Sequence, residues 1–152
     1  MSTTNNGNWQ APLYYILAVA GLAGTWAQAV GYLDAGFLGG NLLFWKETLA
    51  TPASTFIVVD IFVLGAAVFV LMFAEGRRLG IGTPWLWGYF LGSMLIGISC
   101  FVPLFLAHRQ RVLHTRHPEQ NTAPTGADLI AVGLAVLLAL GMVGYSLMNI
   151  PA

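Results

Sequence analysis

Residues 51–80 read TPASTFIVVDIFVLGAAVFVLMFAEGRRLG. Before Glu75 this stretch carries a single charged side chain, Asp60, among apolar and small residues. A helix of about 20 residues crosses the hydrocarbon core of a bilayer, so the apolar run is long enough to span it. Thr51 and Pro52 have the types favoured at the N-cap and the first position of a helix. The stretch therefore predicts a membrane-spanning helix that begins at Pro52 and ends in a charged turn.

Three further apolar runs have the same character. Strands of a membrane barrel would be about 10 residues long with strict alternation, and none of the runs shows this pattern. Residues 37–49 are too short to span, and their Leu and aromatic side chains surround Lys46 and Glu47, which predicts a short interfacial helix. A plain loop is the alternative for this segment. We expect an all-α integral membrane protein of four transmembrane helices, over residues 13–33, 52–74, 84–107 and 129–150.

The composition excludes an ordinary soluble domain. Of the 152 residues, 8% are charged and 57% are hydrophobic, whereas an average soluble domain has about 25% charged residues. The net charge is zero, so the chain has no basic surface for nucleic acid. The partners expected are the lipid bilayer and other membrane protein subunits, and no nucleic acid.

The runs divide a single transmembrane domain, residues 1–152, into three parts. A three-helix core covers residues 13–112, a polar loop 113–126 and an extra helix 127–152. Four spans would place both termini on one side of the membrane, together with Arg77 and Arg78. The other side would hold the remaining basic residues, and the positive-inside rule then favours both termini outside. The basic residues on that other side are Lys46, Arg109, Arg111 and Arg116.

Asp60 is the most informative side chain, because an acid inside a span is costly and marks function by default. It lies about 12 Å into the membrane at 1.5 Å per residue. Ser99 lies at a similar depth in the third span, and Pro103 leaves the Ser99 carbonyl without a helical donor. A proton or cation path through Asp60 is the alternative to a structural role. The pattern predicts a structural polar layer formed by Asp60, Ser99, Thr25 and Gln28.

Other polar residues lie at the ends of the runs. His108 is a candidate ligand for a pigment or haem, and chlorophyll, carotenoid and quinone are the cofactors left open. His114 and His117 have a spacing that can clamp a metal, but the sequence offers no third ligand, so no metal site is expected. No segment resembles a zinc-protease, serine-hydrolase or phosphate-loop motif, so no catalytic residues and no enzyme activity are expected. The residues expected to anchor the second helix at the interface are Glu75, Arg77 and Arg78.

Several features of residues 51–112 resemble the family of small bacterial membrane proteins known as domain of unknown function 2834. The matching residues are Pro52, Ser54, Phe56 and Asp60, then Glu75 and 77–80, Trp85, and finally Gly97, Ser99, 103–106 and Arg109. The resemblance extends over about residues 13–112 and implies a three-helix membrane protein without an assigned activity. It also implies a bacterial inner membrane or thylakoid-type membrane. The chain departs from the family by adding the polar loop and the last helix.

The function expected from these features is that of a non-catalytic accessory or scaffolding subunit in a larger photosynthetic or respiratory membrane complex. The small residues of the last helix support it, because small residues allow membrane helices to approach closely. The alternative is a small transporter, a pore, or a pigment- or quinone-binding protein that uses Asp60. Transporters are usually built from internal repeats, and the sequence has none. The small residues in question are Ala131, Ala135, Ala139, Gly133, Gly141 and Gly144.

Overall fold

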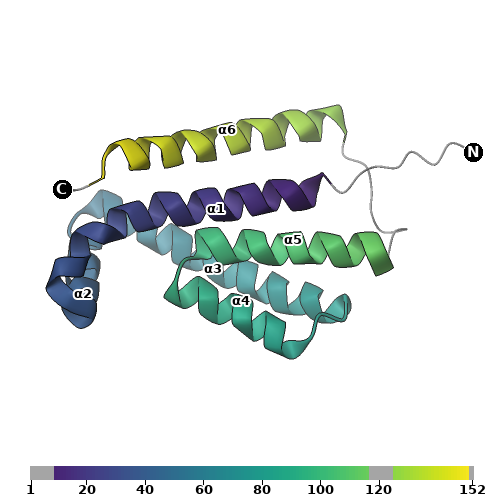
Figure 1. Cartoon of the computed structure of the whole chain (residues 1–152), viewed down its shortest axis with the longest axis horizontal. Coiled ribbons are helices and arrows are strands. Elements are labelled where there is room, and N and C mark those ends of the chain that lie inside the picture. The colour runs from purple at the N-terminus through teal and green to yellow at the C-terminus, as the bar shows by residue number, and fades with distance from the viewer. Residues whose placement is uncertain (1–8, 117–124, 151–152) are drawn as a thin grey trace, which may run out of the picture.

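A computed structural model describes residues 9–116 and 125–150, and the described chain is all-α. Its long helices run side by side along one axis (Figure 1). Three apolar segments are long enough to cross a membrane: Gln10–Ala35, Pro52–Arg78 and Gly126–Met148. The elements are α1 (Gln10–Ala29), η1 (Val30–Ala35), α2 (Gly36–Thr48), α3 (Pro52–Arg78), α4 (Thr83–Leu95), α5 (Ile98–Arg116) and α6 (Gly126–Met148).

The start of α3 is the one that the sequence predicts. Thr51 has an extended backbone, and its hydroxyl accepts a hydrogen bond from the Ser54 amide at 3.1 Å. The Ser54 hydroxyl in turn accepts from the Thr51 amide at 3.3 Å, which completes a capping box. At the other end Arg77 and Arg78 occupy the last turn, where positive charge is favoured by the helix dipole.

The expected third span, residues 84–107, is wrong as a single helix. The chain leaves helical structure after Leu95 and reverses, so α4 and α5 form an antiparallel hairpin (Figure 1). The amides of Ile96 and Gly97 both donate to the Gly92 carbonyl, at 2.9 Å and 3.2 Å. Gly92 also lacks the side chain that would collide with the ring of Phe101 across the hairpin. One long helix and two short ones can have the same apolar composition. The composition of residues 84–107 therefore does not predict the break after Leu95.

Helix α1 closes the tip of this hairpin. The Trp26 indole donates a 3.0 Å hydrogen bond to the Ile96 carbonyl, which lies at the bend. Nearby, a Cβ atom added to Gly21 would lie 2.6 Å from the Ser99 carbonyl oxygen. Glycine at position 21 therefore lets the backbones of α1 and α5 meet at a distance that no other residue allows.

The apolar core lies between α3, α4 and α5. Met72, Leu86 and Phe105 are its largest fully buried side chains, one from each of these helices. Gly76 of α3 faces Leu86, and Gly65 of α3 faces Ile98 at the start of α5. Gly65, Met72 and Gly76 thus mark the face of α3 that points into the protein.

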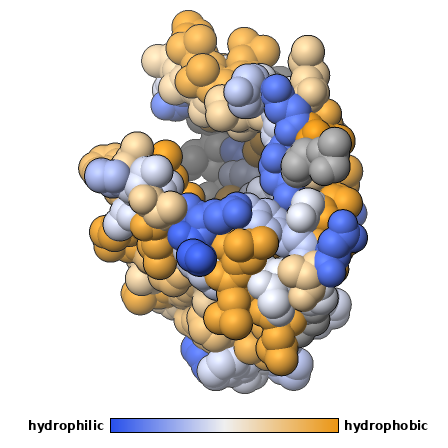
Figure 2. Space-filling view, turned by 90° about the vertical axis from the view of Figure 1, so that its left-hand side faces the viewer, coloured by the Kyte–Doolittle hydropathy of each residue, from blue (hydrophilic) through white to orange (hydrophobic). Residues whose placement is uncertain are grey.

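Among the described elements, α6 packs on α1 alone. Gly24 faces Val143, and one turn later Gln28 meets Ser146, so the two helices run in the same direction. Figure 2 shows the end of the molecule that carries α2, where a hollow opens beneath α6, the uppermost helix. The rest of the α6 surface is exposed, which leaves a large apolar area without a covering neighbour in this chain.

The helix expected near residues 37–49 is present as α2. It lies at one end of the bundle (Figure 1), and its side chains are mostly exposed, Leu38 and Leu42 among them. The Tyr32 hydroxyl donates to Glu47 at 2.7 Å and Trp45 contacts Phe62, which fixes α2 to the chain on both sides of it.

The first helix begins and the last helix ends at opposite ends of the bundle. Helix α1 begins at the end where α3 finishes, whereas α6 finishes at the end that carries α2 (Figure 1). This arrangement is at odds with the expectation that both termini share one side. The hairpin is the reason, because it returns the chain to the end from which it entered.

We expect Gly21→Ala to destabilise the fold by about 1–3 kcal/mol, because its methyl group overpacks the contact with the Ser99 backbone. Gly88→Ala is the matched control, since nothing lies within 4 Å of a Cβ atom there. An exposed Gly→Ala change inside a helix is neutral or stabilising by about 0.5–1 kcal/mol. Thermal unfolding in detergent measures both variants, and equal midpoints would contradict the close contact of α1 with α5.

Candidate functional site

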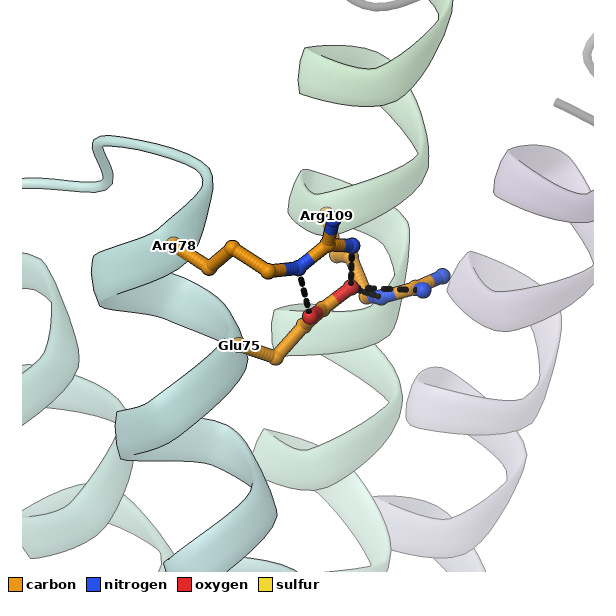
Figure 3. A network of polar contacts seen from close by, with 3 residues as sticks. All are labelled: Glu75, Arg78 and Arg109. Atoms are coloured by element: carbon orange, nitrogen blue, oxygen red, sulfur yellow. Dashed lines mark hydrogen bonds and ion pairs between the residues drawn. The ribbon is translucent and has the colours of Figure 1, made fainter. Parts of the chain in front are cut away.

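Three charged side chains form a network at the end of α3 (Figure 3). Glu75 of α3 accepts from Arg78 of the same helix, with Arg78 Nε 2.6 Å from Oε2 and Nη2 2.7 Å from Oε1. Arg109 of α5 donates from Nε to Glu75 Oε1 at 2.9 Å, and its Nη2 lies 2.7 Å from the same oxygen. One carboxylate thus holds two guanidinium groups and ties α3 to α5.

The depth of these groups differs. The Glu75 side chain is 12% exposed, whereas Arg109 and Arg78 are 29% and 52% exposed. The carboxylate is therefore shielded and the two cations form the outer surface of the network. Charge-assisted hydrogen bonds of this kind are stronger than neutral ones, and each arginine has a forked geometry that suits them.

A cavity of about 340 Å³ opens beside this network. Leu71 lies one turn before Glu75 on α3, and Leu106 lies one turn before Arg109 on α5. We call the apolar part of the cavity, nearer the hairpin tip, its base, and the charged part, nearer the ends of the helices, its rim. We call the whole the arginine cavity, lined by Leu71, Glu75, Arg78, Phe105, Leu106 and Arg109.

His108 lies next to Arg109 but faces α4. Its Nδ1 is 3.0 Å from the Tyr89 hydroxyl, and its ring packs edge-on against Trp85. Burial lowers the pKa of His108 from its usual value, and the charges of Arg111 and Arg116 lower it further. A lowered pKa favours the neutral imidazole, which can pair with the Tyr89 hydroxyl in either direction.

Most of the basic residues gather at this end of the molecule. Arg111 of α5 stacks on Tyr15 of α1 at 5.0 Å, while Lys46 lies in α2 at the opposite end. The hairpin is responsible, because it brings the end of α5 beside the end of α3. Five of the six Lys and Arg residues are at this end: Arg77, Arg78, Arg109, Arg111 and Arg116.

Two members of the expected polar layer do come together. A Cβ atom added to Gly97 would lie 3.6 Å from Ser99 Oγ and 4.0 Å from Thr25 Oγ1, so both hydroxyls face the hairpin tip. Thr25 donates to the Gly21 carbonyl of its own helix at 2.8 Å. Ser99 Oγ is buried, and it has no hydrogen-bond partner among the described residues.

Asp60 does not take part in this layer, contrary to the prediction. It precedes the inward-facing Gly65 by five residues, which places it about 140° away around the helix. The side chain is exposed, and the described residues offer it no hydrogen-bond or ion-pair partner. Its expected depth match with Ser99 assumed an unbroken third span, and the hairpin removes that match.

Gln28 pairs with the last helix rather than with the expected layer. Its Nε2 donates to the Ser146 carbonyl at 2.7 Å, and Ser146 Oγ donates to the Gly24 carbonyl at 2.6 Å. Sequence reasoning missed Ser146 and Asn149, whose carbonyl also accepts from Gln28 at 3.2 Å. The signal was present, since Ser146 and Asn149 are the polar side chains near the end of an otherwise apolar run.

The remaining candidates stay apart from this site. His114 is exposed in the last turn of α5, and His117 lies outside the described residues. No group of three His, Cys, Asp or Glu side chains that could hold a metal occurs within residues 9–116 and 125–150. Arg77 is exposed at the end of α3, beside the network but not in it.

Residues 13–111 match the family described as Protein of unknown function DUF2834. This chain belongs to that family. The resemblance seen in the motifs is thus confirmed, and the matched region ends within α5, so α6 is an addition to the part that the family shares. No curated protein and no solved structure matches the chain.

We expect Glu75→Gln and Arg109→Gln to lower the unfolding midpoint by about 2–4 °C, the shift that corresponds to about 1 kcal/mol in a chain of this size. Either change leaves a partly buried charge without its partner. Arg78→Gln should cost less, because that side chain is the more exposed cation. Arg77→Gln is the control and should leave the midpoint unchanged. If all four variants unfold alike, the network does not hold α3 to α5.

Proposed function

We propose that this chain is an integral membrane protein in which three helices cross the bilayer and the α4–α5 hairpin enters it without crossing. The length of α4 supports the proposal that the hairpin does not cross. Helix α4 has 13 residues, about 20 Å at 1.5 Å per residue, against a hydrocarbon core of about 30 Å. The crossing segments proposed are the three long apolar ones, Gln10–Ala35, Pro52–Arg78 and Gly126–Met148.

The hairpin tip then lies near the middle of the bilayer. It contacts Gly21, near the centre of the first apolar segment, and Gly65, near the centre of α3. A break in a helix at this depth requires that its carbonyls find donors within the protein. The hydrogen bond from Trp26 to the Ile96 carbonyl meets this requirement for the residue at the bend.

Three crossings place the two termini on opposite sides. Helices α3 and α5 both end at the side that holds five of the six basic residues, and Lys46 is the one on the other side. The positive-inside rule therefore places the start of α1 in the cytoplasm and the end of α6 outside. Four spans would instead put both termini outside, because Arg109, Arg111 and Arg116 would then lie on the side opposite Arg77 and Arg78.

Cysteine labelling tests this topology. In a Cys100→Ala background, single cysteines at Thr83 and Arg116 should react with an impermeant maleimide only in inverted vesicles. Cysteines at Lys46 and Asn149 should react only from outside. Four spans would instead group Arg116 with Lys46 and Asn149 with Thr83, so that pairing would remove the three-crossing topology.

The role that we infer is that of a non-catalytic subunit that packs against other membrane proteins. Asp60 carries this inference. In the proposed topology it is a carboxyl group on the outer face of a crossing helix, and lipid offers it no hydrogen-bond donor. Ala53, Ala67 and Ala74 repeat on the same face at seven-residue spacing and are exposed. Small residues around a polar group are typical of a helix contact, so another helix is expected to cover this face.

Helix α6 supplies a second open face. Nothing lies within 4 Å of a Cβ atom added to any of its glycines. At 3.6 residues per turn these glycines fall within a sector of about 80°, turned away from the Val143 side that meets α1. They are Gly126, Gly133, Gly141 and Gly144.

We expect the wild-type protein to migrate on native gels, in mild detergent, as part of an assembly larger than its own 16.3 kDa. Gly133→Leu combined with Gly141→Leu should release it, because the added side chains block close approach to α6. Gly88→Leu is the control, since position 88 is equally open but lies on α4.

Asp60→Leu should weaken the assembly more than Asp60→Asn, whose amide still forms hydrogen bonds. A wild-type protein that migrates alone would refute the subunit role. In that case the exposed Asp60 would favour a small pore or transporter.

A further inference from the structure

The arginine cavity combines a cationic rim with an apolar base. This combination is complementary to an anionic phospholipid, whose headgroup is charged and whose acyl chains are apolar. We propose that it binds the headgroup of an anionic phospholipid, with the upper part of an acyl chain on Leu71 and Leu106. This inference rests on the membrane embedding proposed above. It does not depend on whether the protein has partner subunits.

The charge of the network favours an anion. Arg78 and Arg109 bring two guanidinium groups to the rim of the cavity, where both donate to the Glu75 carboxylate. The carboxylate is the most shielded of the three groups, and the cations face outward. An approaching phosphate therefore meets the arginines before it meets the acid.

The guanidinium groups are also held in place before a ligand arrives. Arg109 directs Nε and Nη2 toward Glu75, and within the described residues its Nη1 has no hydrogen-bond partner. A guanidinium carries five N–H donors, and phosphate oxygens fit its planar fork. Because Glu75 fixes the orientation of Arg109, little side-chain entropy remains to be lost when a phosphate binds.

The direction of α3 and α5 places the apolar and the charged residues of the cavity at different depths. Both α3 and α5 run outward toward the charged end, and each places an apolar residue one turn before its charged one. Leu71 is exposed and lies toward the centre of the bilayer, below Glu75 and Arg78. The basic end is the cytoplasmic one in the proposed topology, and the cytoplasmic leaflet is where anionic lipids concentrate.

Native mass spectrometry of the detergent-purified full chain tests the proposal, with phosphatidylglycerol or phosphatidylcholine supplied in equal amounts. We expect phosphatidylglycerol to be retained roughly tenfold better, a difference of about 1.4 kcal/mol. Arg109→Gln should abolish this preference. Arg77→Gln removes the same charge from the same end of α3, outside the cavity, and should leave the preference intact.

Leu71→Trp is a second variant that tests the site without removing the ion pairs of the network, in case Arg109→Gln unfolds the protein. It keeps every charge and changes an exposed position, yet it fills the base of the cavity, so it too should remove the preference. Equal losses in Arg77→Gln and Arg109→Gln would overturn the site in favour of diffuse attraction to the basic end. Retention of phosphatidylglycerol by both Arg109→Gln and Leu71→Trp would overturn it as well.

Competition with inorganic phosphate distinguishes a site for a lipid headgroup from a site for free phosphate. Millimolar phosphate should not displace the lipid, because it makes no contact with the apolar base. Full displacement would overturn the lipid site and identify a site for free anions. If alkaline carbonate strips the protein from membranes, the proposed embedding fails. If the protein stays in the membrane but shows no preference for phosphatidylglycerol, only the lipid inference fails.

Discussion

The contact between α1 and the hairpin tip is the constraint on which the remaining structure depends. At Ile96 the chain leaves helical structure, and its carbonyl needs a donor other than an amide further along the same helix. Trp26 provides the donor, and Gly21 lets α1 come close enough to reach it. Without this closure residues 84–107 would gain hydrogen bonds by forming one helix, and α5 would then run in the opposite direction. The tip contact therefore selects between two topologies of the same apolar sequence.

The direction of α5 decides where the charges lie. Because α5 runs parallel to α3, Arg109 reaches Glu75 and the basic side chains of α5 join Arg77 and Arg78 at one end. The same reversal makes the number of proposed crossings odd and concentrates positive charge on one side. In the proposed topology insertion and folding favour the same orientation, since the positive-inside rule acts on the charge distribution that the hairpin creates.

The sequence predicted the local features well and the long-range ones less well. The cap at Thr51, the α2 helix and the long apolar segments follow from residue types and run lengths, which are local properties. The break at residues 96–97 depends on a donor from α1, and no periodicity within the run contains that information. Asp60 was assigned to an inner layer because small residues recur around it, but that spacing identifies a packing face and not the partner that it packs against.

The exposed positions of α3 and α6 have a different meaning in a bilayer from the one they have in water. Exposed leucine or valine on these helices is compatible with lipid and needs no partner. Asp60 is not compatible with lipid in this way. A carboxyl group that faces lipid costs free energy unless another protein supplies a hydrogen-bond donor. In a soluble protein the same residue would be an ordinary surface acid, and its exposure would carry no information. For a membrane-embedded chain, the polar position that its own helices leave uncovered is therefore the best guide to where a neighbour binds.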